Sequence, residues 1–201
     1  MEIILATHNL DKCKELQESL SDSKIKILTL SDFPEISEIV EDGNTLEENA
    51  FIKSRTVFGL TKIPTISDDT GLEVDALKGA PGIYSARYAG PNASYNDNVS
   101  KMLKELKDID QKYRTATFKT VVTFVSKDLE LVSEGSVKGF ITEKPYGNSG
   151  FGYDPIFYVL EKNKTFSEMN INEKKQCSHR GKAIANLKHC LLYTSDAADE
   201  R

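Results

Sequence analysis

Two long segments of alternating apolar and polar residues constrain the fold of this 201-residue chain more than any other feature. Thr115 to Val125 alternates with the period of a strand, as does Glu130 to Ile141, and only four residues separate them. Because so short a connection joins antiparallel neighbours, we expect a long hairpin whose turn lies at Lys127 and Asp128.

The N-terminal region mixes strands and helices. Apolar runs and helical periodicity predict a strand over Glu2 to Ala6, a polar loop over Thr7 to Asp11, a helix over Lys12 to Leu20 and a strand over Ile25 to Leu30. This order is that of a β-loop-α unit. The sequence therefore favours an α/β fold.

Hydroxyl residues mark the starts of further helices. Thr45 followed by Glu48 has the spacing of a capping box, which predicts a helix reaching about Phe58, with Gly59 placed to end it. The same reasoning predicts a helix from Ser94 to about Leu106 and a last helix after Ser178.

Composition and charge narrow the class of protein. A hydrophobic content of 39% suits one domain, expected over residues 1–193, followed by a polar tail at 194–201. The net charge of −5 and the lack of a basic face argue against a nucleic-acid partner. No apolar export or membrane segment opens the chain, so we expect a cytoplasmic protein with no membrane partner. Its cysteines are expected to be ordinary thiols.

Two adjacent carboxylates are the strongest chemical signal. Asp68 and Asp69 follow a β-branched run over Ile63 to Ser67, and Gly71 permits a tight turn before a further strand over Leu72 to Asp75. We therefore expect both carboxylates at a strand end, where they could hold a cation. The alternative is a turn with an Asx-type hydrogen bond.

Two further segments could complete such a site. Thr7, Asn9 and Lys12 lie between a strand and a helix, which favours anion binding, although Asn9 could serve only as a helix cap. Glu41, in an acidic loop, could join Asp69 around Mg²⁺, and Lys53 follows on the next helix. The alternative for these charges is solvated surface.

The C-terminal half carries candidates for base recognition. Gly147 to Asp154 is a glycine-rich loop whose aromatic residues could stack on a nucleobase while Asp154 accepts a base N–H. Lys174, His179 and Arg180 could donate to a carbonyl oxygen. The alternatives are a hairpin turn with a core Phe, and a helix cap followed by solvent-facing polar residues.

Five blocks in order give the chain a specific resemblance. They are ATHNLDK at residues 6–12, EDGNTLEENAFIK at 41–53, SDDTGLEVDALKGAPGIYSARYAG at 67–90, FGYDPIF at 151–157 and SHRGKA at 178–183. Together they resemble the inosine triphosphate pyrophosphatase family. The resemblance implies an elongated α/β fold with a long mixed β-sheet, flanking helices and two lobes around a central cleft, and a homodimer. It also implies Mg²⁺-dependent hydrolysis of ITP, dITP or XTP to the monophosphate and pyrophosphate.

The same resemblance implies roles for single residues. Asp69 matches the general base, and Glu41 and Asp69 match metal-linked positions. Substrate contacts are implied for Thr7, His8, Asn9, Leu10, Asp11, Lys12, Lys53, Thr70, Phe151, Gly152, Tyr153, Asp154, Lys174, His179 and Arg180. The chain departs from the family pattern at His8, where a small residue is common, and at Thr70, where Ser is common.

Two other functions compete with this hypothesis. A pyrophosphatase of related shape could act on modified pyrimidine triphosphates, and a non-catalytic module could bind purine nucleotides as a sensor. Discrimination against adenine follows if His179 and Arg180 donate to the 6-oxo group, because a 6-amino group would leave those donors unpaired.

Overall fold

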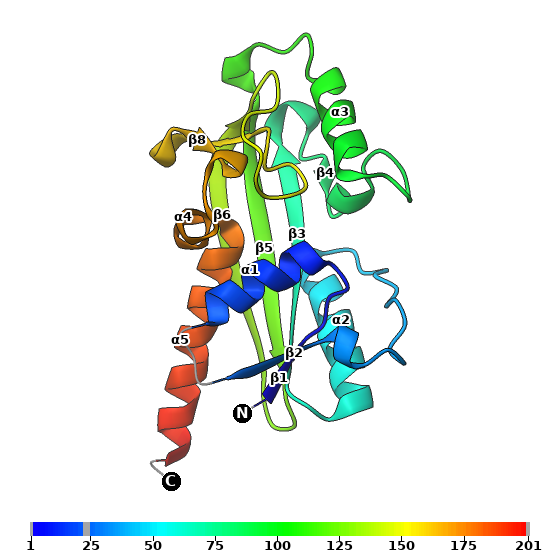
Figure 1. Cartoon of the computed structure of the whole chain (residues 1–201), viewed down its shortest axis with the longest axis vertical. Coiled ribbons are helices and arrows are strands. Elements are labelled where there is room, and N and C mark those ends of the chain that lie inside the picture. The colour runs from blue at the N-terminus through cyan, green and yellow to red at the C-terminus, as the bar shows by residue number, and fades with distance from the viewer. Residues whose placement is uncertain (1, 22–24, 200–201) are drawn as a thin grey trace. The chain divides into compact units, whose positions relative to one another are not determined.

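The computed structural model describes residues 2–21 and 25–199, with side chains as far as Leu191, and has a mixed α/β fold (Figure 1). In these residues the α-helices are α1 (Leu10–Leu20), α2 (Leu46–Thr61), α3 (Tyr95–Glu105), α4 (Ile171–Cys177) and α5 (His179–Asp199). The strands are β1 (Glu2–Leu5), β2 (Lys26–Thr29), β3 (Thr65–Val74), β4 (Pro81–Gly82), β5 (Thr115–Val125), β6 (Glu130–Ile141), β7 (Phe157–Val159) and β8 (Lys164–Thr165). No helix of the described part is long and apolar enough to cross a membrane.

The strands form one mixed sheet in the order β2-β1-β3-β5-β6-β7-β8, and β4 pairs with β3. Pairing is parallel from β1 to β2 and to β3, and antiparallel from β7 to β6 and to β8. The predicted hairpin is confirmed with the bounds expected for both strands, and the Ser126 N–H closes its turn by donating to the Leu129 carbonyl oxygen at 2.8 Å.

The chain divides into two compact units. Unit 1 comprises residues 1–69, 120–135 and 178–201, and unit 2 comprises residues 70–119 and 136–177. Strands β3, β5 and β6 each contribute residues to both units. Each unit is described below by itself.

Unit 1 has apolar side chains on both faces of its sheet, because successive residues of a strand point to opposite sides. Helices α1 and α5 lie side by side (Figure 1). Ile3 and Leu5 of β1 pack with residues of both helices. Ile4 and Ala6 pack on the other face, with Val57 of α2. Ile184 and Leu187 of α5 are buried core residues on the same face as Ile3 and Leu5.

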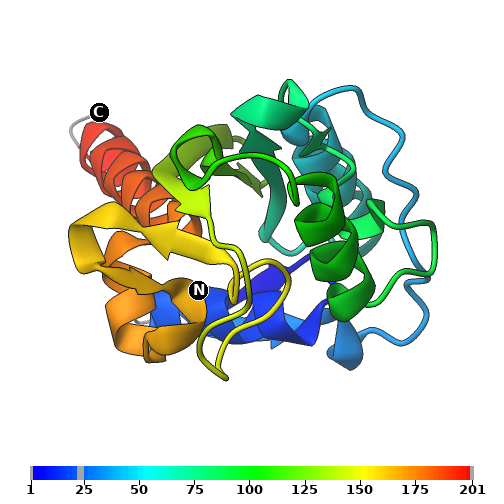
Figure 2. The same cartoon turned by 90° about the horizontal axis from the view of Figure 1, so that it is seen from above.

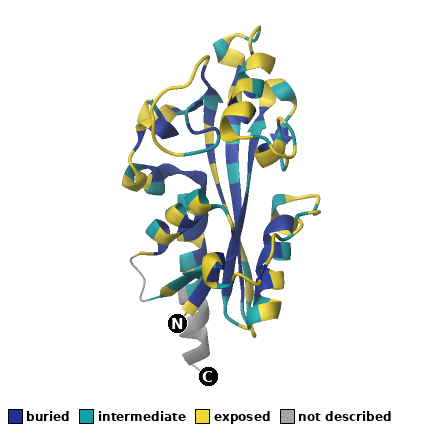
Figure 3. Cartoon of the chain, turned by 45° about the vertical axis from the view of Figure 1, so that its right-hand side comes forward, coloured by how far each residue is buried: buried dark blue, intermediate teal, exposed yellow. Residues whose placement is uncertain are grey.

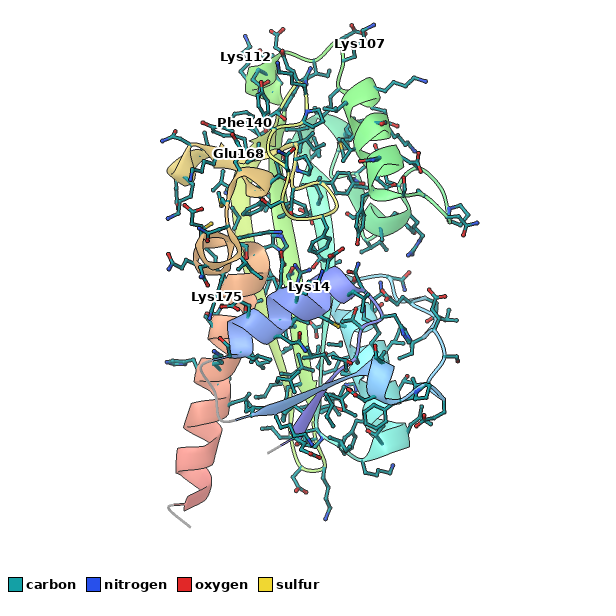
Figure 4. The ribbon with its side chains drawn as sticks, in the orientation of Figure 1. Lys14, Lys107, Lys112, Phe140, Glu168 and Lys175 are labelled. Atoms are coloured by element: carbon teal, nitrogen blue, oxygen red, sulfur yellow. The ribbon has the colours of Figure 1, made fainter. Side chains whose placement is uncertain are left out.

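Unit 2 has an aromatic core. The ring of Phe118 lies 4.8 Å from that of Phe157 and 6.1 Å from that of Phe166, measured between centroids. Phe140, labelled in Figure 4, stacks on Tyr158 across the pair β6 and β7 with centroids 4.6 Å apart.

Helix α3 packs beside the segment that contains residues 85–87 (Figure 2). Asn98 of α3, which is 2% exposed, fastens this segment. Its amide nitrogen donates to the Ala86 carbonyl oxygen at 3.0 Å and its amide oxygen accepts from the Ala89 N–H at 2.8 Å.

The structure corrects several predicted boundaries. Strand β3 runs without a break from Thr65 to Val74, so the expected turn at Gly71 and the separate strand after it are wrong. Figure 3 shows the buried colour continuing along the strands of the sheet. Neighbouring strands on both sides of β3 supply its hydrogen bonds, and this pairing outweighs the low strand propensity of one glycine.

Helix bounds also differ. Helix α2 passes through Gly59 and ends at Thr61, where Lys62 takes the left-handed conformation with φ 60° instead of the glycine. Helix α1 begins at Leu10, two residues earlier than predicted, because Asn9 caps it. The backbone of α5 is helical through Asp199, so it includes residues 194–199 of the expected polar tail. The division of the chain at residue 193 stays a prediction.

A close approach of β6 to α5 fixes the start of the last helix. The Ser178 hydroxyl accepts from the Gly181 N–H at 3.1 Å, which confirms the predicted cap. A Cβ at Gly135 would lie 2.1 Å from the His179 carbonyl oxygen and 2.4 Å from the Ala183 nitrogen. Because both atoms belong to the backbone, only glycine allows this approach.

Candidate active site

Strand β3 passes through the middle of the sheet and separates the two adjacent aspartates. Since neighbouring side chains of a strand alternate, Asp68 shares a face with Ile66, on the side of α1 and α5, and Asp69 shares the other face with Ser67, on the side of α2. The expectation of a strand end is therefore wrong. The two carboxylates do not form one acidic pair, because each faces a different set of partners.

Asp68, fully buried, lies in a network of four charged residues that we call the Asp68 cluster: Lys12, Glu15, Asp68 and Arg180. Its Oδ2 accepts from Nη2 and Nε of Arg180 at 3.0 and 3.2 Å, and the Lys12 Nζ lies 3.3 Å away. Nη1 of Arg180 pairs with Glu15. One guanidinium thus joins two carboxylates that come from different elements.

The charges of this cluster reinforce one another. Burial alone would raise the pKa of Asp68, but Lys12, Arg180 and Lys53 outweigh it and hold the pKa well below its usual range. Burial likewise opposes the charge of Arg180, yet Asp68 and Glu15 raise its pKa. Both groups are therefore ionised at neutral pH.

Asp69 belongs to a second network, the Asp69 cluster, which consists of Glu41, Asn49, Lys53 and Asp69. The Lys53 Nζ lies 2.9 Å from a Glu41 oxygen and 3.8 Å from the Asp69 Oδ1. The amide of Asn49 donates to the Asp69 Oδ2 at 3.2 Å. The side chain of Lys53 is only 7% exposed, so it is no solvated helix lysine, and it brings the acidic loop to the strand.

The carboxyl group of Asp69 differs from that of Asp68 in its pKa and in its exposure to solvent. Burial raises its pKa, Lys53 and Lys12 oppose that rise, and Glu41 and Asp68 add to it, so that the pKa is raised overall. Its side chain keeps 11% of its surface exposed, whereas that of Asp68 keeps none. A carboxylate with a raised pKa and partial access to solvent is suited to accept a proton from water.

Glu41 and Asp69 are the two carboxylates of this cluster that could hold a divalent cation. Both carboxylates lie within 4 Å of one ammonium nitrogen, which shows that this point attracts a positive charge. Across the described residues, no group of three or more His, Cys, Asp or Glu side chains gathers in a metal-binding arrangement. Two carboxylates match the coordination preference of Mg²⁺. This ion usually binds one or two protein carboxylates and completes its coordination shell with phosphate oxygens and water. The residues therefore fit the ion.

The segment from Thr7 to Lys12 turns from β1 into α1. The side-chain oxygen of Asn9 accepts from the N–H groups of Asp11 and Lys12 at 3.0 and 3.1 Å, and the Thr7 hydroxyl accepts from the Asn9 N–H at 3.2 Å. The helix-cap alternative is thus confirmed for Asn9. His8 and Leu10 are exposed, the latter by 65%. An anion-binding role of this segment stays a prediction.

His179 begins α5 and is almost fully buried. Its Nδ1 lies 2.6 Å from the hydroxyl oxygen of Thr120 on β5, and this hydrogen bond orients the imidazole ring. Arg180, the next residue, is held by Asp68 and Glu15 as described above. The structure thus gives Arg180 a definite internal role, and base contacts by either residue stay predictions.

Unit 2 holds the other substrate candidates. Buried Asp154 pairs with Lys174 of α4 and accepts from the Phe151 N–H at 2.9 Å. The Lys174 Nζ lies 4.9 Å from the centroid of the Phe151 ring, and the ring of Tyr95 lies 5.7 Å from the same centroid. The predicted aromatic loop is therefore fastened at its C-terminal end.

The remaining candidates of unit 2 are Thr70, Gly152 and Tyr153. The hydroxyl of Tyr153 donates to the Ser85 carbonyl oxygen at 3.0 Å, which ties this loop to the segment before α3. Gly152 has a φ of +61°, a conformation that glycine adopts without strain. Thr70 follows Asp69 on β3 and is half-buried.

Sequence reasoning missed three residues that contact the predicted site: Glu15, Asn49 and Thr120. Glu15 lies three positions after Lys12 on one helix, which places both on the same face, and this spacing was a usable signal. Asn49 was also detectable, since asparagine is unfavourable inside a helix and its presence calls for a reason. Nothing in the strand pattern around Thr120 distinguishes it.

The fold and the site define a mixed α/β protein with two charged networks on opposite faces of one central strand. Residues 3–190 match the family model of the Ham1 family, and the chain belongs to this family.

Sequence and structure comparisons agree with that assignment. A dITP/XTP pyrophosphatase of Thermoanaerobacter pseudethanolicus is 43% identical, covering 96% of this chain and 97% of the relative. The Ham1 protein of Staphylococcus aureus is similar in structure, with a TM-score of 0.84 and 38% identity over 96% of this chain and 100% of that one. A HAM1 protein of Coxiella burnetii gives a TM-score of 0.85 and 39% identity, covering 96% and 99%.

Proposed function

We propose that this protein hydrolyses purine nucleoside triphosphates with deaminated bases, namely ITP, dITP and XTP, to the monophosphate and pyrophosphate. The Asp69 cluster carries the proposal, because it places a carboxylate with a raised pKa next to a buried lysine and a second carboxylate. Membership of the Ham1 family, and the dITP/XTP pyrophosphatase activity for which relatives are named, support the substrate class.

In the proposed reaction Asp69 accepts a proton from the attacking water. The water oxygen forms a bond to the α-phosphorus, the bond from that phosphorus to the bridging oxygen breaks, and pyrophosphate leaves with the electron pair. Lys53 and Lys12 supply positive charge for the phosphate oxygens. Asn49 and Lys53 hold the Asp69 carboxylate while it takes the proton.

We assign the divalent ion to Glu41 and Asp69 and name Mg²⁺ as the physiological choice. When bound, Mg²⁺ neutralises phosphate charge and acts as a Lewis acid. Two observations support this assignment: both donors are oxygen atoms, and their number matches the coordination preference of Mg²⁺.

The candidate substrate contacts are retained as part of the proposal. Thr7, His8, Asn9, Leu10, Asp11 and Lys12 are assigned to the triphosphate, and His179 and Arg180 to the 6-oxo group of the base. Thr70, Phe151, Gly152, Tyr153, Asp154 and Lys174 are assigned to the substrate. The support is the resemblance of their motifs, together with the burial of His179, whose ring is oriented by Thr120.

We also propose a homodimer and a cytoplasmic location. The family resemblance supports the dimer, and light scattering on the purified protein would measure its mass. Cys13, Cys177 and Cys190 carry free thiols, which suits a reducing compartment.

A substrate panel tests the proposed function. The protein is incubated with ITP, XTP, ATP and dUTP in the presence of Mg²⁺, and the products are separated by ion-exchange chromatography. We expect IMP or XMP with pyrophosphate, and little turnover of ATP. Release of orthophosphate, equal turnover of ATP, or a preference for dUTP would overturn the proposal, and tight binding of ITP without turnover would indicate a sensor.

A further inference from the structure

Asn49 occupies an unusual place for an asparagine. It lies in the first turns of α2, where its backbone N–H donates to the Thr45 carbonyl oxygen at 3.1 Å, and it is only 1% exposed. Burying an amide side chain is unfavourable unless its donor and acceptor find partners. The partners of Asn49 therefore indicate why the residue is there.

Both ends of the amide are engaged, and each reaches a different part of the site. The amide nitrogen donates to the Asp69 Oδ2 at 3.2 Å. The amide oxygen accepts from the Gly43 N–H at 2.9 Å. The opposite orientation would face the amide oxygen toward a carboxylate and the amide NH₂ group toward an N–H donor, so the chemistry of the partners decides the orientation.

The loop that Asn49 holds is the loop that carries Glu41. Gly43 follows Glu41 by two residues, and a Cβ there would lie 2.7 Å from the Glu48 Cβ and 2.8 Å from the Asn49 Oδ1. The next residue is also fixed, because the Asn44 N–H donates to the Glu48 carboxylate at 2.6 Å. The loop thus packs tightly against the start of α2.

We propose that Asn49 is a positioning residue that holds the Asp69 carboxylate and the Glu41 loop in a fixed relation through one amide. The inference rests on the proposed function for its catalytic consequence. Asn49 does not react. It restrains one carboxylate oxygen of Asp69 and the loop on which the second acidic residue lies, so that both groups keep the geometry required by the reaction.

Unit 2 offers a matched control. Asn98 is also a buried helical asparagine whose amide joins two groups, but its partners are backbone atoms of Ala86 and Ala89. Loss of either amide removes two hydrogen bonds of similar length. A purely structural role predicts equal effects of Asn49→Ala and Asn98→Ala, whereas the positioning role predicts a loss of turnover only for the first.

The experiment compares Asn49→Ala, Asn49→Asp and Asn98→Ala with the wild-type protein, at a temperature below every unfolding transition. We expect kcat for ITP to fall about 10- to 100-fold in both Asn49 variants, the range seen for residues that orient catalytic groups, with KM changed much less. Asn98→Ala should keep kcat within about threefold while losing as much thermal stability. Wild-type kcat in either Asn49 variant, or an equal loss in Asn98→Ala, would overturn the proposal.

Hydrogen exchange gives a readout that does not depend on activity. The Gly43 amide should exchange about tenfold faster in Asn49→Ala, because it loses its acceptor, and should stay protected in Asn49→Asp, which keeps that oxygen. Unchanged exchange of the Gly43 amide in Asn49→Ala would contradict the proposal that Asn49 holds the Glu41 loop. If Asn49→Ala does not fold, the kcat of the near-isosteric variant Asn49→Asp tests the proposal instead. If wild-type protein releases no pyrophosphate from ITP, the proposed function fails. The exchange measurement still tests whether Asn49 holds the Glu41 loop.

Discussion

The two faces of the sheet give two aspartate side chains different surroundings and opposite shifts in pKa. On one face Asp68 is fully buried, is held by Arg180 and Lys12, and has a lowered pKa. On the other face Asp69 retains some access to solvent, has Lys53 and Asn49 as partners, and has a raised pKa. Neighbouring positions of one strand therefore acquire different tasks, because alternation gives each its own surroundings.

The comparison separates a carboxylate that stabilises the fold from one for which we propose a catalytic role. A buried carboxylate that is fully neutralised contributes to holding elements together, since removal of its partner leaves an uncompensated charge. A carboxylate whose ionised form is disfavoured by burial instead gains affinity for protons. We expect substitutions at the two positions to affect different measurements.

The largest effect is expected for Asp69→Asn. Loss of the general base should lower kcat for ITP by about 10²- to 10⁴-fold, the usual contribution of acid–base catalysis. Because the ionised carboxylate is disfavoured in the fold, the free energy of unfolding should stay equal or rise. Steady-state kinetics and urea unfolding measure the two quantities, and a variant with nearly full activity would contradict the role of Asp69.

Asp68→Asn should show the reverse pattern. The substitution leaves the guanidinium of Arg180 and the ammonium of Lys12 with reduced compensation in a buried position. Breaking a buried pair costs about 3–5 kcal/mol in free energy of unfolding. Chemical denaturation checks this value, and a change below about 1 kcal/mol would show that the Asp68 cluster does not hold α1 and α5 to the sheet.

The two aspartates should also give opposite dependences of stability on pH. The lowered pKa of Asp68 stabilises the fold above the usual value of 3.8, and this contribution is lost as pH falls below it toward the folded-state pKa. The raised pKa of Asp69 makes the fold bind a proton more tightly, so stability declines as pH rises from 3.8 through the raised value.

Unfolding curves measured against pH test this contrast. Asp68→Asn should reduce the loss of stability at low pH, and Asp69→Asn should reduce the decline of stability above pH 3.8. For turnover, kcat/KM should fall at low pH, where the carboxylate of Asp69 is protonated and can no longer act as a base. Identical pH profiles for the two variants would show that the two aspartates do not differ in their electrostatic surroundings.

The smallest effect is expected at the surface of unit 1. Arg55 of α2 makes two hydrogen bonds with Glu130 of β6, at 3.0 and 2.6 Å, but both side chains are about half exposed. Solvent and salt screen such a pair, so Arg55→Met should cost about 0.2–1 kcal/mol and less in 1 M salt. A cost similar to that of Asp68→Asn would show that burial does not explain the difference.

Local pattern predicted a large part of this fold. The hairpin of β5 and β6 and the caps at Thr45, Ser94 and Ser178 depend on alternation and short-range hydrogen bonds, which the sequence displays directly. The unbroken course of β3 could not be predicted, because its hydrogen bonds come from strands distant in the chain.

The site divides in the same way. Lys53 was a candidate by motif, but its burial between Glu41 and Asp69 depends on how α2 packs against the sheet. The separation of Asp68 from Asp69 needed only the knowledge that both lie inside a strand. Glycine at position 71 obscured that fact, since it is equally compatible with a turn.

Because residue 135 has no side chain, the backbone of β6 can contact the backbone at the start of α5. A library that randomises this codon, selected for folded protein, should return glycine almost exclusively, since even alanine would strike the carbonyl oxygen of His179. The first residue of the helix would move with that collision and so would its bond to Thr120. The hydrogen atom in place of a side chain at position 135 is therefore what allows α5 to begin where it does.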